Sequence, residues 1–461
     1  MASRKIWRPC YDLNEEIETF TVGKDYLLDQ ELVVWDCLGS MAHGTMLRSI
    51  GLLTEEELER LKAELVRIME DAEQGRFSVR MEDEDVHAAV EDRLIEAAGE
   101  VGKKIHTARS RNDQILVDLR LFAKAKLLVL ERDLLGLCLG LADLAERHRD
   151  VPMVGRTHMR RAMPSSVGLW AGSFLESLLD DREVLVCAYG INDQCPLGSA
   201  ASYGVPLEID RDLTAKLLGF PKAQNNVLYV NNSRGKIESI VLSACVQIAQ
   251  DLAKLAQELI LFSMPEFGYF EIPSELCTGS SIMPQKANPD GLELVRAKSA
   301  TVLSHLFRTL EIVRTLPTGY NRDGQETKEP FMEGLSLTLS CVRVMALTVG
   351  KLEVREERLL EGFHPEVFAT DKALELVGSG TPFREAYEEV KRSLDSLAEL
   401  DPKEAIQRRT HRGGTGNLGL EELRERIARW ENDRTQRTED FVQCMKALSG
   451  KAASSFLKGL C

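Results

Sequence analysis

The chain has 461 residues, of which 44% are hydrophobic and 28% are charged, and it carries a net charge of −15 at pH 7. This length is too great for one compact core, so the composition predicts a soluble globular protein of two or three domains. The negative charge argues against a general affinity for nucleic acid or for acidic membrane surfaces. An anionic substrate would therefore need a local cluster of cations or main-chain amides.

The ten cysteines are scattered along the chain without a C-x-x-C pair. Four of them fall within apolar helical patterns, where a cysteine acts as a small hydrophobic residue: Cys138, Cys187, Cys245 and Cys341. We interpret all ten as reduced thiols of a cytoplasmic protein. The start, MASRKIWRPCYDLNEE, has no apolar centre of a signal peptide, and no uninterrupted apolar run approaches the roughly 18–20 residues needed to span a bilayer.

Long stretches without proline organise the chain, because proline breaks the interior of a helix. The capping-box pattern that begins at Thr54 predicts a helix through about Glu73. Apolar residues then recur with a helical period in four longer stretches: Leu116–Leu144, Ile237–Phe262, Leu292–Val313 and Leu335–Leu360. Near the end of the chain, Thr381 and Pro382 form a cap and a first-turn proline that open a further helix.

Strand signals are weak and brief, so we expect an all-α protein. Helices of about 30 residues are about 45 Å long and usually pack side by side. The pattern predicts three helical domains: a small N-terminal domain over residues 1–108, a long central bundle over 109–360 and a small C-terminal domain over 361–461. Several central helices are apolar on more than one face, which favours an oligomer, with a thick monomeric core as the alternative.

Five polar segments interrupt these helical patterns and are the candidate functional sites. The first, IHTARSRNDQ over residues 105–114, places Ser110, Arg111 and Asn112 just before a long helix. Arginine, hydroxyl and amide donors near a helix N-terminus suit a carboxylate or a phosphate group. A solvated capping turn, with Asp113 as a first-turn acid, is the alternative.

The second segment, GRTHMRRAMP over residues 155–164, contains Thr157 and His158 beside arginines. A histidine near its unperturbed pKa of about 6.5 exchanges protons at neutral pH, although a lone histidine is more often structural. The third segment, CTGSSIMPQKANPD over residues 277–290, contains Ser280, Lys286 and Asn288. A serine becomes basic only when its alkoxide is stabilised, which Lys286 and the loop amides would do; a serine-rich turn before a helix is the alternative.

The fourth segment, YNRDGQETK over residues 320–328, supplies the phenol of Tyr320, the amide of Gln325 and the cation of Lys328. An ordinary charged connection between helices explains it equally well. The fifth segment, EDVHAAVEDR over residues 84–93, contains Asp85 and His87, which either orient a ligand or lie on a helix surface. The sequence has no paired-histidine metal motif, no G-x-G-x-x-G and no Walker loop, so it predicts no metal, dinucleotide or ATP site.

The third segment resembles a family signature. GSSIMPQKANP is similar to G-S-S-x-M-P-x-K-x-N, the signature of the fumarase/aspartase superfamily. Within that superfamily the chain most resembles the argininosuccinate lyase/delta-crystallin family, whose blocks are matched in order by HTARSRNDQ, THMRRAMP, PLGSAA, MPQKANPDGLELVRAK and YNRDGQETKE. TDKALELVGSGTPFREAYEEV and THRGGTGN match as well, so the resemblance covers about Trp35 to Asn417.

The resemblance implies a homotetramer of three-domain helical subunits, with each active site built from three subunits and without a metal or organic cofactor. It implies a β-elimination that converts argininosuccinate to arginine and fumarate in arginine biosynthesis. In such a reaction a base removes a proton next to a carboxylate, and donors and cations stabilise the dianion that forms. A general acid then assists the departure of the guanidino group.

The same resemblance implies a role for each matched residue. Ser280 corresponds to the catalytic base, and Lys286 and Asn288 to residues that bind the succinyl carboxylate and stabilise the intermediate. His158 corresponds to an acid or proton relay that Glu293 polarises. The substrate-binding positions are Ser40, Ser110, Arg111, Asn112 and Thr157, with Tyr320, Gln325 and Lys328 at the arginine end. Asp85, His87 and Arg234 are expected near the site.

The chain departs from the family pattern in three places. The opening reads KIWRP instead of K-L-W-G-G-R-F, and T-H-x-Q-R-A-Q is replaced by THMRRAMP, with Arg160 and Met163 at two glutamine positions. The block N-S-M-D-A-x-S-D-R-D reads NNVLYVNNSRG, which keeps Asn226 and Arg234 but loses acids. These changes leave open an alternative, a carbon–nitrogen lyase that releases fumarate from a different N-substituted aspartate. A non-catalytic structural protein would carry damaged polar segments, whereas the serine, lysine and histidine named above are all present.

Overall fold

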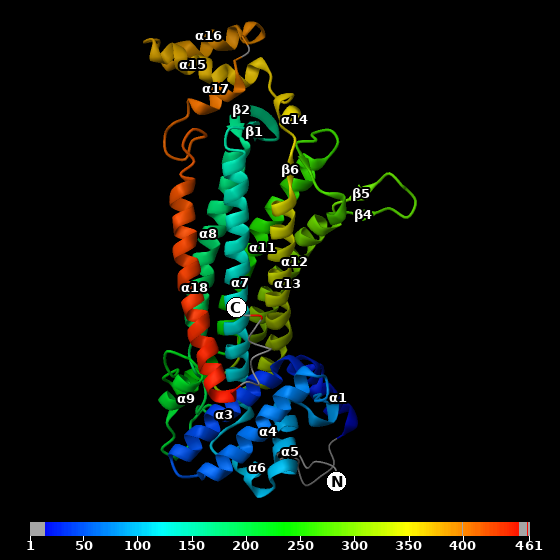
Figure 1. The fold of residues 1–461 in the computed structure, drawn as a ribbon, viewed down its shortest axis with the longest axis vertical. Helices are drawn as coiled ribbons and strands as arrows, with labels where there is room; N and C mark the ends of the chain where they lie inside the picture. The colour runs from blue at the N-terminus through cyan, green and yellow to red at the C-terminus, as the bar shows by residue number, and fades with distance from the viewer. Residues whose placement is uncertain (1–13, 399, 451–458, 460–461) are drawn as a thin grey trace.

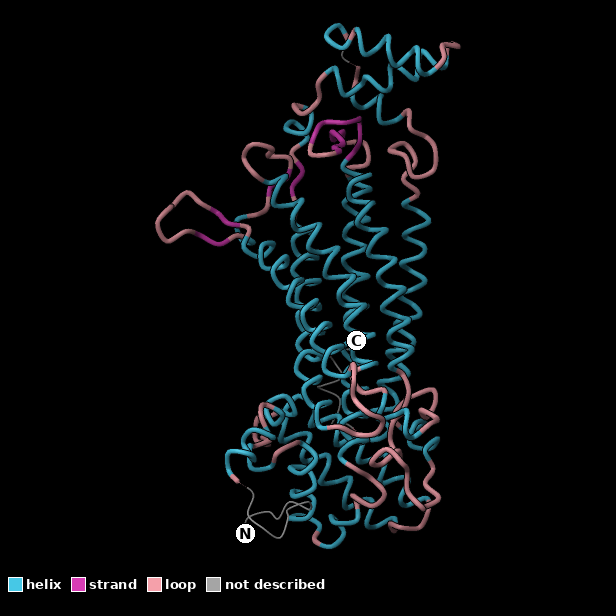
Figure 2. Tube along the Cα trace, turned by 180° about the vertical axis from the view of Figure 1, so that it is seen from behind, coloured by secondary structure: helices cyan, strands magenta, loops and turns pink. Residues whose placement is uncertain are grey.

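A long helical bundle forms the body of the molecule in the computed structural model, which describes residues 14–398, 400–450 and 459 (Figure 1). Shorter helices gather at each end of this bundle (Figures 1 and 2). The N-terminal end contains α1 (Glu15–Val22), α2 (Asp25–Asp29), α3 (Val33–Ser49), α4 (Glu55–Glu73), α5 (Val86–Ala98) and α6 (Glu100–Lys104), with the 3₁₀ turns η1 (Gln30–Leu32) and η2 (Met81–Asp83). The predicted capping box at Thr54 is confirmed, because its side chain and that of Glu57 exchange hydrogen bonds with each other's main chain.

The bundle consists of six long helices: α7 (Arg111–Arg147), α8 (Val167–Asn192), α11 (Lys236–Ser263), α12 (Asp290–Val313), α13 (Lys328–Lys351) and α18 (Leu420–Ser449). Its centre is α7, whose 37 residues span about 55 Å and contact α8, α13 and α18. Leucines of α7 are buried along its whole length, as the periodic pattern predicts; Leu116, Leu130 and Leu144 are examples. Of the predicted long helices, the one expected to reach Leu360 ends at Lys351, where a short strand interrupts it.

The described residues also form three two-stranded antiparallel sheets, which the weak strand signals do not predict. They pair β1 (Pro152–Thr157) with β2 (Arg160–Ser166), β3 (Phe270–Glu271) with β6 (Glu353–Val354), and β4 (Thr278–Gly279) with β5 (Ala287–Asn288). They lie toward one end of the bundle, and β4 and β5 form the base of a hairpin that projects sideways (Figure 2). These short sheets shape the second and third polar segments and leave the mostly helical fold intact.

The remaining described elements connect the bundle to its ends. They are α9 (Arg211–Leu217), α10 (Val227–Asn232), η3 (Ser274–Leu276), η4 (Arg322–Thr327), α14 (Glu356–Leu360), η5 (Pro365–Phe368), α15 (Ala369–Gly378), α16 (Phe383–Arg392), η6 (Leu394–Ser396) and α17 (Pro402–Gln407). Helices α15–α17 form the end of the molecule opposite the N-terminal helices (Figure 1). The opening KIWRP lies outside the described residues. All eight cysteines in the described part are free thiols, as predicted.

Judged only by length and composition, two segments of the bundle could cross a membrane. The sequence analysis did not single them out, because neither is an uninterrupted apolar run. They are Lys236–Ser263 and Arg322–Lys351, with 61% and 50% of the apolar window buried. The first contacts α8, α12 and α13. The core of a helical bundle therefore accounts for the hydrophobic character of both segments.

A pair of carboxyl groups joins α8 to α11. Asp181 is only 8% exposed. Burial, the charges of Asp251 and Asp180, and a hydrogen bond with Asp251 raise the pKa of Asp181 to about 7. Ser177 donates a further hydrogen bond to Asp251. The folded state therefore holds a proton at Asp181 that an exposed aspartate would release.

Replacing Asp181 by asparagine should stabilise the protein at alkaline pH. The carboxyl ionises near pH 3.8 in an unperturbed setting and near pH 7 in the fold, so the free energy of unfolding falls as the pH rises between these values. Above pH 8, Asp181→Asn should raise this free energy by on the order of a few kcal/mol, and near pH 4 it should have little effect. Denaturant unfolding at both pH values measures the difference. The neighbouring Asp180, with its side chain 84% exposed, supplies the control Asp180→Asn, and an equal response of that control would contradict the assignment.

Candidate active site

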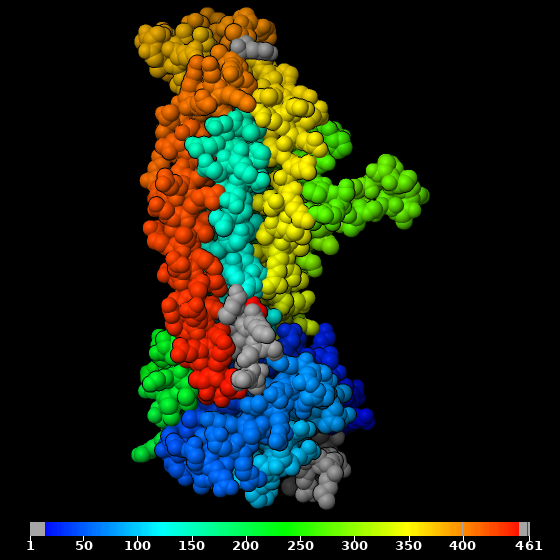
Figure 3. Space-filling model, in the orientation of Figure 1, coloured from blue at the N-terminus to red at the C-terminus, as the bar shows by residue number. Residues whose placement is uncertain are grey.

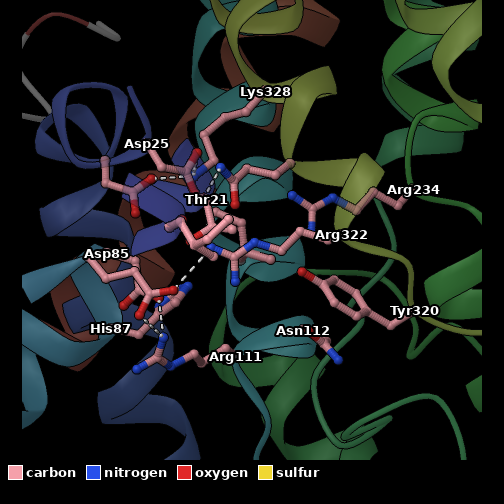
Figure 4. A pocket seen from close by; sticks show the side chains of 15 residues that line it. Thr21, Asp25, Asp85, His87, Arg111, Asn112, Arg234, Tyr320, Arg322 and Lys328 are labelled. Carbon is pink, nitrogen blue, oxygen red and sulfur yellow. Dashed lines mark hydrogen bonds and ion pairs between the residues drawn. The ribbon is translucent and has the colours of Figure 1, made fainter. Parts of the chain in front are cut away.

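Residues from three of the five polar segments meet in one pocket between the N-terminal helices and the bundle (Figure 4). The pocket has a volume of about 370 Å³. Its lining includes eight predicted site residues: Asp85, His87, Arg111, Asn112, Arg234, Tyr320, Gln325 and Lys328. Positions separated by more than 200 residues in the sequence therefore share one pocket.

The first polar segment forms the N-terminus of α7. Ser110 caps the helix, and its hydroxyl accepts a hydrogen bond from the amide of Asn112. The carboxylate of Asp113 accepts hydrogen bonds from the amides of Ser110, Gly198 and Ala200. The capping turn expected as the alternative is thus present, and it presents Arg111 and Asn112 to the pocket at the positive end of the helix dipole.

Acidic and basic side chains alternate around the pocket wall. Arg111 Nη1 donates to Asp85 Oδ2 at 2.9 Å and to Glu84 Oε2 at 3.2 Å. Arg322 Nη2 donates to Glu84 Oε1 at 3.0 Å and to the carbonyl of Thr21 at 2.9 Å. Glu84 thus joins the first and fourth polar segments, and its positive φ of 73° sets the chain direction at this junction.

Lys328 is the most deeply buried cation of the pocket, with 1% of its side chain exposed. Its Nζ lies 2.5 Å from Asp29 Oδ1 and 2.8 Å from Asp25 Oδ1. Burial alone lowers the pKa of Lys328, but the charges of Asp29 and Asp25 outweigh it and raise the pKa. Lys328 is therefore a charged lysine whose charge two carboxylates already balance.

Gln325 and Tyr320 occupy the same wall. Gln325 Nε2 donates to the carbonyls of Thr21 at 3.1 Å and of Val22 at 3.4 Å. Tyr320 is 38% exposed, and no hydrogen bond of its hydroxyl is present in the described part of the chain. The phenol thus remains available to a ligand.

His87 separates this pocket from a second one of about 490 Å³ that is lined by Glu91, His106, Arg109, Ser110, Ala200 and neighbouring residues. His87 Nδ1 bonds Asp36 Oδ2 at 2.6 Å and lies 3.7 Å from Asp118 Oδ2. Burial lowers the pKa of His87, but the hydrogen bond and the charge of Asp36, helped by Asp85, shift the pKa upward overall. In the second pocket, burial and two arginines lower the pKa of His106 to about 4, so His106 is neutral at pH 7.

Asp36, His87 and Asp118 are the one group in the described residues whose potential metal ligands lie within 4.8 Å of one another. The 2.6 Å between His87 Nδ1 and Asp36 Oδ2 is a hydrogen-bond distance. Two ligands on one ion with bonds of about 2.0–2.2 Å stand farther apart than this. The buried charges are balanced by protons instead, because burial and the charge of Asp36 raise the pKa of Asp118 well above its usual range.

Ser40 lies on α3 and is 1% exposed. Its hydroxyl accepts a hydrogen bond from Arg109 Nη1 at 2.8 Å. Arg109 lines the second pocket, so Ser40 reaches that pocket only through the arginine. The structure thus places Ser40 behind the pocket wall, as a support for Arg109.

The serine loop stands away from the body of the molecule (Figure 3). The pairing of β4 with β5 closes its base, and Thr278 donates a hydrogen bond to Asp290 at the start of α12. Within the loop, the amides of Met283 and Ile282 donate to Ser280 Oγ at 3.2 and 3.4 Å. These amides would stabilise negative charge on the serine oxygen, as the loop composition predicts. Ile282, at 82% exposure, and Lys286 face outward.

The second polar segment lies beyond the far end of the bundle. Thr157 and His158 are exposed, and His158 and Met159 form a two-residue turn between β1 and β2 with φ values of 51° and 60°. Both residues adopt the left-handed region, which non-glycine residues enter at an energetic cost. Glu293, on the first turn of α12, is also exposed. Within one chain, the β4–β5 hairpin that contains Ser280 projects from the side of the bundle, and the β1–β2 turn that contains His158 lies at the end near α15–α17 (Figure 1). The pocket is lined by residues of the N-terminal helices and of the adjoining end of the bundle.

The sequence analysis missed four residues that line the pocket, Asp25, Asp29, Glu84 and Arg322, and also Asp36, which bonds the lining residue His87. Asp25 and Asp29 stand four residues apart in DYLLD, a spacing that puts both carboxylates on one helix face. This spacing could have identified Asp25 and Asp29 from the sequence. The remaining missed residues are recognised only from their tertiary contacts.

Comparisons with known proteins show which family the chain belongs to. A family model described as "Lyase" matches residues 19–304. The argininosuccinate lyase of Thermotoga neapolitana is 44% identical over 84% of this chain and 97% of that protein. The argininosuccinate lyase of Sorangium cellulosum is 40% identical over 93% and 99%.

Solved structures share the fold at low sequence identity. EDDS lyase in complex with formate has a TM-score of 0.78 and 21% identity, covering 96% of each chain. Class II fumarase from Schistosoma mansoni has a TM-score of 0.69 and 16% identity, covering 84% of this chain and 94% of that one. The fold and the matched family model thus define a fumarase-like lyase. With relatives at 38–44% identity over most of its length, the chain belongs to the argininosuccinate lyase family.

The pKa of His87 should depend on Asp36. With Asp36 present, the pKa of His87 should lie above 6.5. In Asp36→Asn it should lie below 6.5, because burial lowers this pKa and the hydrogen bond and charge of Asp36 that raise it are lost. Nuclear magnetic resonance of the protein labelled at histidine nitrogen measures both titrations. His148 is the internal control, because its lowered pKa results from burial and Arg147, opposed by Glu356, and from neither Asp36 nor His87. A His87 titration that is the same in both proteins would contradict the role of this hydrogen bond.

Proposed function

We propose that this protein cleaves argininosuccinate to arginine and fumarate, as a soluble cytoplasmic homotetramer that serves arginine biosynthesis. The observation that carries the proposal is the gathering of Arg111, Asn112, Tyr320, Gln325 and Lys328 in one pocket of a chain whose curated relatives at 40–44% identity are argininosuccinate lyases. The pocket contains acidic and cationic side chains, which suit a substrate that carries both positive and negative groups. The choice of reaction rests on the relatives, which are argininosuccinate lyases.

In this proposal Ser280 is the base. The amides of Ile282 and Met283 stabilise its oxygen as the proton leaves, and Lys286 adds positive charge when the loop closes over the substrate. Asn288 and Lys286 hold the carboxylate next to the carbon that loses its proton. Negative charge that develops on this carboxylate is thereby met by donors that are already in position.

The leaving guanidino group needs a proton donor. We assign this role to His158, with Glu293 as the carboxylate that polarises it and Thr157 as a nearby substrate contact. His158 is exposed at a strained two-residue turn, a place where it can meet a ligand or another subunit. Ser110, Arg111 and Asn112 bind the succinyl half from the other side.

An active site of this kind requires several copies of the chain, because the serine loop, the His158 turn and the pocket lie apart in one copy. The outer face of the bundle supports such an assembly. Helices α12 and α13 expose large apolar residues there: Leu294, Phe307, Leu310, Val344 and Leu347. Packing of this face against other subunits would bury it and bring the three segments together. We retain the three-part division 1–108, 109–360 and 361–461, with α18 joining the bundle from the last part.

Mixing the purified protein with argininosuccinate should release fumarate, which is followed by its ultraviolet absorbance. Ser280→Ala should lower kcat by orders of magnitude without changing the oligomer, because the base is lost. The adjacent Ser281 is exposed and provides the matched control Ser281→Ala, which should retain most of the activity. Near-normal turnover of Ser280→Ala would move the base to another residue.

The reverse reaction separates this proposal from a lyase for another N-substituted aspartate. With fumarate and a panel of amines, arginine should be the best amine by a wide margin. A better amine than arginine would favour the alternative, which the changed THMRRAMP and NNVLYVNNSRG blocks motivate.

Two inactive variants should restore activity when they are combined. Ser280→Ala damages the loop and Asn112→Leu damages the pocket, so a mixed oligomer contains some sites in which both parts are intact. Co-expression with two affinity tags, followed by tandem purification, isolates such oligomers for the fumarate assay. A pair in which both chains carry Ser280→Ala is the control. Activity no higher than the sum of the two variants would mean that each site lies within one chain.

A further inference from the structure

The amino-acid end of the proposed substrate carries two opposite charges that need different partners. Its ammonium group can meet the four carboxylates of the first pocket, which lie among four cations: Asp25, Asp29, Glu84 and Asp85 beside Arg111, Arg234, Arg322 and Lys328. Its carboxylate needs a cation that is not already balanced. Lys328 does not meet this need, because both Asp25 and Asp29 lie within 2.8 Å of its Nζ.

A smaller pocket adjoins the first one and shares Arg234 and Tyr320 with it. It has a volume of about 210 Å³, and we call it the Arg234 pocket. Its lining residues are Asn231, Asn232, Arg234, Val313, Leu316, Pro317, Thr318, Gly319, Tyr320, Asn321 and Gly324. This set contains one guanidinium and no carboxylate, so the Arg234 pocket is cationic, whereas the lining of its neighbour has four carboxylates and four cations.

Two donors of the Arg234 pocket lack a partner in the described part of the chain. Asn231 is only 6% exposed, and its Nδ2 is buried without a hydrogen bond. The Nε of Arg234 is also buried without one, and the described residues offer the guanidinium no ion pair. Buried donors without an acceptor cost free energy, so native proteins usually supply one. A ligand carboxylate has the acceptors that these two groups lack.

The chain holds both donors in fixed positions. The Arg234 side chain crosses Gly324, where a Cβ would stand 2.9 Å from Arg234 Cδ. At the start of α11, Gly235 has a φ of 77° and packs so closely on Val313 that no side chain fits. Asn232 Oδ1 accepts a hydrogen bond from the amide of Gly319 at 2.8 Å and ties α10 to the loop before Tyr320. These contacts set the position of Arg234 and of the loop before Tyr320, so that a small shift of the side chains would present both donors to a ligand.

We propose that Asn231 and Arg234 form a subsite for the α-carboxylate of the departing amino acid. This subsite rests on the proposed lyase function, and it makes the changed NNVLYVNNSRG block a determinant of which amine the enzyme accepts. The carboxylates of the first pocket take the ammonium group, and the Arg234 pocket takes the carboxylate. Tyr320, which borders both pockets, lies between these two groups.

The reverse reaction tests the subsite with two probes. Arginine carries the α-carboxylate, and agmatine is the same guanidine without it. The wild-type enzyme should add arginine to fumarate with a kcat/KM about 10- to 100-fold higher than that for agmatine, as expected for hydrogen bonds to a charged group. The decrease in fumarate absorbance measures both rates.

Asn231→Asp keeps the size of the side chain and places a negative charge in the subsite. It should raise KM for arginine about 10- to 100-fold, leave kcat within a few-fold, and leave KM for agmatine unchanged. Arg234→Gln should act in the same direction. The matched control is Asn225→Asp, which adds the same charge at an exposed position of the same segment and should change neither KM. Thermal unfolding of each variant verifies that it is folded.

The possible results separate the subsite from the overall function. A wild-type enzyme that uses agmatine as well as arginine overturns the subsite while the lyase function stands, and this comparison needs no variant. Equal losses with both amines in Asn231→Asp also overturn it, because they indicate a structural role. A wild-type enzyme that adds neither amine to fumarate overturns the proposed function and the subsite with it.

Discussion

The pocket depends on one buried ion pair, in which Lys328 lies between Asp25 and Asp29. This contact joins the start of α13 to the short helix α2, and so attaches the N-terminal helices to the bundle. Removing one partner of a buried pair leaves an uncompensated charge, which typically costs about 3–5 kcal/mol. The same contact sets the electrostatics of the site, because it balances the lysine; of the cations that line the pocket, only Arg234 has no ion pair with a described residue.

In the proposed function, binding and chemistry are assigned to separate parts of the chain around this pair. The pocket is built on the rigid junction of helices, where Glu84 connects Arg111 to Arg322. Ser280 lies on a hairpin that projects from the body and touches little of its own chain (Figure 3). A base on a projecting loop can close over a substrate and exclude water, whereas charged groups that select the substrate need fixed positions.

Sequence reasoning worked best where a local rule decides the outcome. The capping box at Thr54 and the long apolar period of α7 were predicted because each depends on residues a few positions apart. Ser110 was assigned both as a site residue and, in the alternative, as part of a capping turn, and it caps α7 beside the pocket. For Ser40, the resemblance predicts a substrate contact, which stays a prediction, and only the structure reveals that its hydroxyl accepts a hydrogen bond from Arg109.

The sequence by itself determined the helical class, the long helices and the chemistry of the serine loop, because period, caps and loop composition act over short distances. Only the tertiary structure decided that Lys328 is balanced by Asp25 and Asp29, that His87 is held by Asp36, and that Asn231 is buried without a partner. The physical reason is that charge balance and desolvation depend on which side chains meet across the fold. The residues that meet here lie as much as 300 positions apart, and no local pattern encodes their contact.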